Sequence, residues 1–118
     1  RCMFLLFSLL FFAGLSPAAG EDFAALSGVP VMEGLSEVPD SLVVFDKEEG
    51  RLIEAALAGG VAPEDAAAFY REALFQLGWA LDAETPAMLG FSREGERLLI
   101  EFEEGRPLTL RFRLGPEN

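Results

Sequence analysis

The sequence contains no histidine and a single cysteine, Cys2. It therefore cannot form the serine–histidine or cysteine–histidine pair of a typical nucleophilic enzyme. After Cys2 it also lacks the histidine and cysteine ligands that are usual in zinc, copper and haem sites. Basic residues are scarce as well, because 9 lysines and arginines stand against 20 aspartates and glutamates, a net charge of −11. Such an acidic chain repels nucleic acid and anionic membrane surfaces, so we expect no nucleic-acid partner.

The first twenty residues differ from the rest of the chain. A positive charge at Arg1 precedes an apolar run from Cys2 to Leu15, and small residues follow in SPAAG. The run is shorter than the roughly 20 residues of a membrane-spanning helix. This layout predicts a secretory signal peptide over residues 1–20, a mature chain that starts between Ala19 and Glu21, and a periplasmic or secreted protein. The alternative is a leader that stays uncleaved and anchors the protein in the membrane.

The mature chain has no cysteine, so it folds without disulfides and depends on an apolar core. Residues 21–40 are rich in alanine, glycine and proline, and we interpret them as an extended N-terminal segment. Within this segment, VPVM has the composition of one additional edge strand. Residues 41–118 contain the regular patterns and are predicted to form a single domain.

The runs SLVVFDK and RLIEAALA flank Glu48–Gly50 and predict a β-hairpin. A three-residue loop ending in glycine suits a type I turn closed by a left-handed residue. This loop pairs Phe45 with Ile53 and Val43 with Ala55, which puts both apolar pairs on one face of the sheet. We therefore expect this register.

The stretch APEDAAAFYREALFQLGW predicts one helix that begins at Pro63 and ends before Gly78. Proline suits the first helical position because its missing N–H needs no partner there. On a helical wheel of about 100° per residue, an apolar stripe faces the core. Its members are Ala66, Phe69, Tyr70, Ala73, Leu74 and Leu77. Phe75 falls on the opposite side and is predicted to be exposed, while Trp79 is expected to cover one end of the core.

Three more strands are predicted after a loop that contains Pro86, in MLGFSR, ERLLIEFE and LTLRFRL. A two-residue turn at Glu94–Gly95 sets Phe91 opposite Leu98. In the last hairpin, opposite charges favour the register that sets Glu101 opposite Arg111. The alternating pattern turns the following residues toward the core: Leu98, Ile100, Phe102, Leu108, Leu110, Phe112 and Leu114.

The predicted fold class is α+β, because hairpins surround a single helix. We expect an antiparallel sheet of about five strands, in the order strand, strand, helix, strand, strand, strand. The helix packs on one face of this sheet, and the signal peptide precedes the domain.

Other sites are not supported by the sequence. Carboxylates are abundant, but nothing places two of them in an apolar pocket, which a carboxylate mechanism requires. The segment DKEEG lacks the alternating ligands of a calcium loop. The glycines of AGGVAPED precede a helix start, but Glu64 and Asp65 there repel a phosphate. We therefore expect no enzymatic activity, no metal site and no cofactor.

Residues 40–114 carry a recurring pattern. A hairpin with FD and GR precedes a helix that ends in FY and LGW, and FSREGERLLIEF follows. This pattern resembles that of small, uncharacterised exported proteins of proteobacteria. The resemblance implies export and an α+β fold, and it implies no activity.

Two functional readings remain open. The first is a non-enzymatic periplasmic interaction or accessory module with an envelope protein as partner, because a sheet covered on one side can bind on the other. The candidate partner contacts are Phe75 on the helix and, on the outer face of the sheet, Leu42, Val44, Leu52 and Leu99. The second is a small-ligand carrier that binds an apolar or cationic molecule between helix and sheet. Alanines at 55, 66 and 73 would leave room for it, and a cavity above roughly 300 Å³ would favour this reading.

Overall fold

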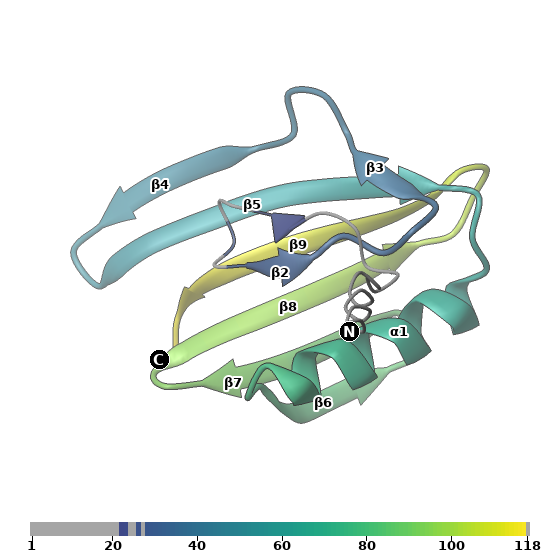
Figure 1. Cartoon of the computed structure of the whole chain (residues 1–118). Helices are drawn as coiled ribbons and strands as arrows, with labels where there is room; N and C mark the ends of the chain where they lie inside the picture. Colours follow the sequence, from purple (N-terminus) through teal and green to yellow (C-terminus); the bar gives the residue numbers. More distant parts are fainter. Residues whose placement is uncertain (1–21, 24–25, 27, 118) are drawn as a thin grey trace, which may run out of the picture.

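The structure is a computed structural model that describes residues 22–23, 26 and 28–117 (Figure 1). The predicted signal peptide and its cleavage site lie outside these residues. The elements in chain order are β1 (Asp22–Phe23), β2 (Val29–Pro30), β3 (Leu35–Glu37), β4 (Val43–Lys47), β5 (Gly50–Gly59), α1 (Pro63–Gln76), β6 (Ala80–Thr85), β7 (Met88–Arg93), β8 (Glu96–Glu103) and β9 (Leu108–Pro116).

Strands β3 to β9 form one antiparallel sheet of 7 strands, in the order β3, β5, β9, β8, β7, β6. Strand β4 also pairs with β5, further along the edge that β3 occupies. The described part of the chain is thus α+β with one helix, as predicted, but the sheet is larger than expected. The added strands are β3, with 3 residues, and the edge strand β6, whose ALDAET sequence has little apolar alternation and a register shift between Leu81 and Ala83.

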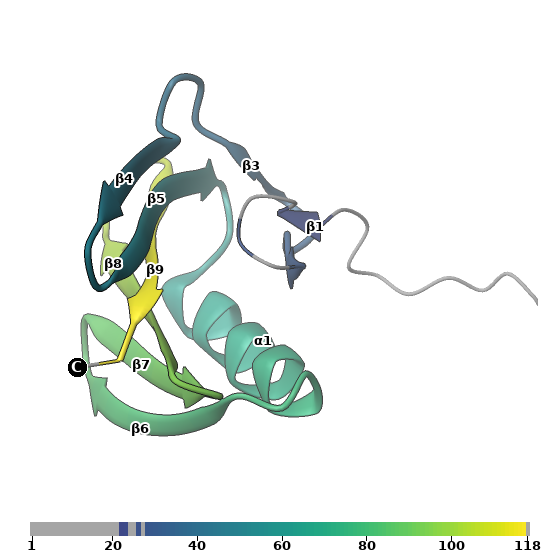
Figure 2. The same cartoon turned by 90° about the vertical axis from the view of Figure 1, so that its left-hand side faces the viewer.

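The sheet curves around α1, and the small β1–β2 sheet lies beside the helix on the same concave side (Figure 2). The core forms between these layers. The helix contributes Ala66, Tyr70 and Leu74, which are buried. The Tyr70 ring stands edge-on against Phe112 of β9, with centroids 5.4 Å apart. All seven residues predicted to face the core from the last two strands do so, with Phe102 only partly buried.

The segment predicted to precede the domain contributes to this same core. Leu26, Val29, Val31 and Leu35 are all buried. The Tyr70 hydroxyl fixes the segment to the helix, because it donates a hydrogen bond to the carbonyl of Pro30 (2.8 Å) and accepts one from the Met32 N–H (3.2 Å). The VPVM stretch therefore pairs with β1 and packs on the helix, away from the edge of the main sheet.

Helix α1 begins at Pro63, as predicted, and the acidic side chains of its first turn favour the positive end of the helix dipole. Gly78 has a φ of +93°, the left-handed conformation that glycine adopts most easily. Leu77 was predicted on the buried stripe, but it is exposed. The helix ends at Gln76 and Leu77 is the cap residue, so it no longer follows the helical periodicity.

The predicted registers hold where both strands are buried. Phe91 pairs with Leu98, and Glu101 pairs with Arg111. The register predicted for the first hairpin is wrong, because Phe45 pairs with Leu52 and Val44 with Ile53. Its loop is Glu48–Glu49, and Gly50 already belongs to β5. The prediction assumed that Val43 and Phe45 face the core, but every residue of this strand is exposed.

Candidate functional site

The clearest binding feature is the free edge of β4, which we call the β4 edge and define as Leu42 together with Val43–Lys47. The strand pairs with β5 on one side, and among the described residues no strand pairs with its other side. Leu42, Val43, Val44 and Phe45 form a continuous run of large apolar residues, each 40–50% exposed. An open edge with exposed apolar side chains is a ready template for another strand.

The rest of β5 on this side is covered by β3 and by the connection to β4. Strand β3 continues along β5, and between the two strands the backbone carbonyl of Ala56 accepts a hydrogen bond from the Val38 N–H (2.9 Å). The Ser41 hydroxyl accepts a hydrogen bond from the Ala56 N–H (3.0 Å). Asp40 has a φ of 63° and lies in the turn between β3 and β4. Of the two strands on this side, β3 has 3 residues and β4 has 5, so β4 offers the longer open edge, and Figure 1 shows it extending away from the helix.

The structure divides the predicted partner contacts among three places. Leu42 and Val44 belong to the β4 edge. Val44 pairs with Ile53, so it lies on the concave face and not on the outer face, as was predicted from the wrong hairpin register. Leu52 and Leu99 lie on the outer face, and both are only partly exposed. Phe75 lies on the helix, on the other side of the sheet.

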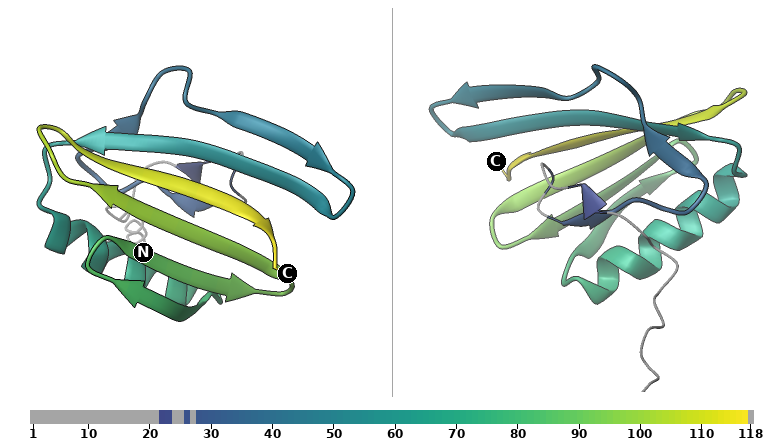
Figure 3. Two further views of the ribbon diagram at one scale, coloured as in Figure 1. Left: turned by 180° about the vertical axis from the view of Figure 1, so that it is seen from behind. Right: turned by 45° about the horizontal axis from the view of Figure 1, so that its top comes forward.

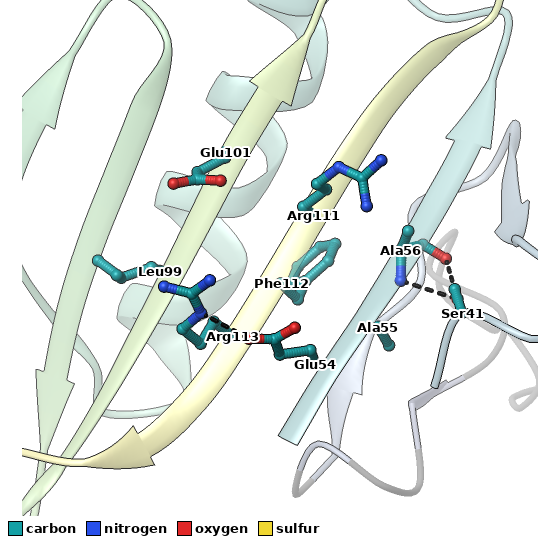
Figure 4. Close-up of a pocket in the computed structure, with 9 residues that line it drawn as sticks. All are labelled: Ser41, Glu54, Ala55, Ala56, Leu99, Glu101, Arg111, Phe112 and Arg113. Atoms are coloured by element: carbon teal, nitrogen blue, oxygen red, sulfur yellow. Dashed lines mark hydrogen bonds and ion pairs between the residues drawn. The ribbon is translucent and has the colours of Figure 1, made fainter. Parts of the chain in front are cut away.

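The outer face has no layer over it in the described part of the chain (Figure 3), but charged side chains occupy its centre. Arg113 pairs with Glu54 at 2.9 Å, and Arg111 pairs with Glu103 at 2.6 Å. Glu54, Arg111 and Arg113 line a hollow of only about 70 Å³ between β5, β9 and β8, which Leu99 also lines (Figure 4). These side chains satisfy one another, so the outer face offers less apolar surface than the sequence suggested.

Two residues that the prediction left out extend the β4 edge onto the outer face. Val43 and Phe45 pair with Glu54 and Leu52, so they share the outer face with these residues. The Leu52 side chain covers Gly115. A Cβ atom added to Gly115 would stand 2.9 Å from the Cδ1 atom of Leu52. The β4 edge is thus apolar on both faces, with Val44 on one side and Val43 and Phe45 on the other.

A second feature is the groove between α1 and the β6–β7 hairpin, which we call the helix groove. The ion pair between Arg71 and Glu84 (2.6 Å) crosses it. Beyond this pair lies a hollow of about 350 Å³, whose large apolar lining residues are Phe75, Trp79, Leu81 and Phe91. A hollow of about 340 Å³ lies at the other end, beside Pro63 and Phe102. The alanines at 55, 66 and 73, which were predicted to leave room for a ligand, line neither hollow.

Phe75 is exposed, as predicted, with 73% of its surface accessible. Trp79 is 2% exposed and closes the end of the core, also as predicted. The Arg93 guanidinium lies 4.4 Å from the centre of the Trp79 ring and donates a hydrogen bond to the carbonyl of Leu77 (2.9 Å). This arginine therefore fixes both the indole and the end of the helix.

A polar cluster stands at the irregular part of β6. Ser92 donates a hydrogen bond to the Asp82 carboxylate, and Arg97 forms an ion pair with it at 2.8 Å. Hydrogen bonds from Arg97, and then from Ser92, hold the pKa of Asp82 below its ordinary value of 3.8. A carboxylate with a lowered pKa is a weak base, so this cluster joins β6 to β7 and β8 and does not activate the serine.

Within residues 22–23, 26 and 28–117, no group of three or more metal-ligating side chains is placed to hold a metal ion. In the same part of the chain, no helix is both long enough and apolar enough to span a bilayer. Compared with protein families, with curated proteins and with solved structures, the chain shows no match. The resemblance to small exported proteobacterial proteins therefore stays a prediction.

Proposed function

We propose that the protein is an exported, non-enzymatic interaction module that binds an extended segment of an envelope protein at the β4 edge. The observation that carries this proposal is the run of four exposed apolar residues along β4, whose outer side has no strand partner among the described residues. Backbone groups of such a strand bind a partner strand by β-sheet extension, and the side chains select it. The leader-like sequence of residues 1–20 supports export.

The free edge also explains why a partner is needed. Many proteins protect an edge strand with a central lysine, a proline or a bulge. In the described structure a turn at Asp40 precedes β4, and the run from Leu42 to Phe45 contains no charge and no proline. An unprotected apolar edge exposes the protein to aggregation unless another chain covers it.

Photo-crosslinking inside the native cell tests this function. We expect benzoylphenylalanine at position 45 to form an adduct with another envelope protein, because this side chain stands on the β4 edge. The same group at position 75 serves as the control, since Phe75 is even more accessible than Phe45 but lies on the helix. Adducts at position 75 and none at position 45 would refute binding at the β4 edge.

The helix groove favours a second candidate function, a carrier of small apolar molecules. Its hollow of about 350 Å³ is within the roughly 300–1,000 Å³ of typical ligand sites, and aromatic side chains line it. In this function, Phe75 forms the exposed wall of the hollow. Binding a ligand would therefore explain why an aromatic residue that does not pack in the core stands at this position.

A neutral fluorophore, 1-N-phenylnaphthylamine, tests the carrier function. Phe75→Ala is expected to change the free energy of unfolding by less than about 0.5 kcal/mol, because the side chain is mostly exposed. If the groove is a ligand site, the same variant weakens binding of the fluorophore. Leu77→Ala is the matched control, because Leu77 is also exposed but does not line the hollow. Equal binding by both variants would count against the groove.

A further inference from the structure

We infer that the segment bound at the β4 edge is a short apolar stretch flanked by lysine or arginine residues of a different protein. This inference rests on the proposed function and specifies its partner. Three observations support this inference. They are the charge distribution along the β4 edge, the like charges that pairing of two copies would bring together, and the apolar residues on both faces of β4.

Acidic side chains stand at both ends of the apolar run. Residues 37–54 contain six acidic and two basic side chains, a net charge of −4. Asp40 precedes the run, and Glu48 and Glu49 follow it. Asp46 is already neutralised by Arg51, at 3.0 Å. At the same end Lys47 offsets one of the two glutamates, so one net negative charge remains at each end of the run. A bound strand therefore meets negative charge at both ends and apolar side chains between, which basic residues on either side of an apolar centre would complement.

A second copy of the chain fits this edge poorly. Two-fold antiparallel pairing of β4 with itself keeps the apolar residues together only when Val43 or Val44 lies on the axis. The first arrangement brings Asp40 toward Asp46 of the other copy, and the second brings Asp40 toward Glu48. Asp40 and Glu48 lie just beyond the ends of β4, so either arrangement gathers acidic side chains at the ends of the paired strands, where like charges repel. The net charge of −11 on each chain adds to the repulsion.

Because β4 has apolar side chains on both faces, the centre of the bound segment should be apolar on both faces as well. Val44 lies on the concave face, and Val43 and Phe45 lie on the outer face. A partner strand that alternates apolar and polar residues would match only one face. Consecutive apolar residues match both, because neighbouring side chains of a strand point to opposite faces.

Fluorescence anisotropy with two labelled peptides tests the inference. Each peptide has the centre threonine, valine, isoleucine, valine, threonine. The first has two lysines at each end, and the second has two glutamates at each end. We expect the lysine peptide to bind at least about tenfold more tightly at low salt, with the difference shrinking at 1 M salt, where the Debye length is about 3 Å. Val44→Lys should weaken binding of the lysine peptide, whereas the control Phe75→Lys, which adds the same charge elsewhere, should not.

The outcomes separate the inference from the function on which it rests. Equal binding of both peptides, lost in Val44→Lys, would overturn the inference about charge and leave the β4 edge as the binding site. Binding of neither peptide, or binding that only Phe75→Lys weakens, would overturn both. A concentration-dependent dimer that Val44→Lys dissociates, seen by sedimentation, would make a second copy the occupant and overturn the inference.

Discussion

Gly59→Ala is expected to lower the free energy of unfolding by roughly 3 kcal/mol, at the upper end of the cost of overpacking. A Cβ atom at this position would stand 1.9 Å from the carbonyl oxygen of Gly34 and 3.0 Å from the Cα atom of Leu35. Both atoms belong to the backbone, so no side-chain rotation relieves the contact. The close approach is where β3 pairs with the end of β5, and the added methyl group would separate the two strands.

Gly60→Ala provides the matched control for this substitution. A Cβ atom at the neighbouring Gly60 would meet nothing within 4 Å. We expect its stability to be unchanged or raised by about 0.4–1 kcal/mol, because alanine restricts the unfolded chain. Urea unfolding followed by the fluorescence of Trp79, the only tryptophan, measures both variants. Equal stability of the two would show that the segment before β4 does not pack on β5 as described.

Stability is expected to fall steeply above pH 10 because of Tyr70. Burial raises the pKa of its hydroxyl above the ordinary value of 10.0. The folded protein therefore keeps this proton at a pH where the unfolded chain loses it. The stabilisation is complete below pH 10 and is lost as the pH rises toward the folded pKa, with a slope approaching about 1.4 kcal/mol per pH unit.

The variant Tyr70→Phe isolates this contribution. At pH 7 we expect it to be less stable by about 1–3 kcal/mol, because the Pro30 carbonyl and the Met32 N–H lose their partner. Above pH 10 it should lack the additional decline, while the general repulsion of an acidic chain is the same in both proteins. Tyr70 is the only tyrosine, so tyrosinate absorbance reports on it alone. Tyrosinate formation near pH 10 in the folded protein would contradict its burial.

Burial explains which parts of the fold could be predicted from the sequence. Strands β8 and β9 face the core along their length, so a shift by one residue would expose Leu98 or Phe112, and only one parity is acceptable. Their registers were predicted correctly for this reason. In β4 no residue is buried, so turn geometry sets the register, and the same reasoning failed.

The candidate site could be predicted only in part for the same reason. Leu42, Val44 and Phe75 were identified as exposed apolar residues, and they are exposed. Val43 and Phe45 were missed because the wrong hairpin register turned them toward the core. The signal that could have identified them is the position of the run LVVF beside a highly charged turn, which is unusual for a strand buried in a sheet. The packing of Leu26 and Val29 on the helix depends on contacts distant in sequence, which local patterns do not contain.

Amide hydrogen exchange of the protein with the lysine-flanked peptide, read residue by residue by NMR, tests the β4 edge most directly. In the free protein, the β4 amides that point away from β5 should exchange rapidly, because they have no partner strand. With the peptide bound they should become protected, while the amides of α1 and β6 stay unchanged. Protection confined to the helix groove, with rapid exchange along β4, would contradict the assignment of the β4 edge as the binding surface.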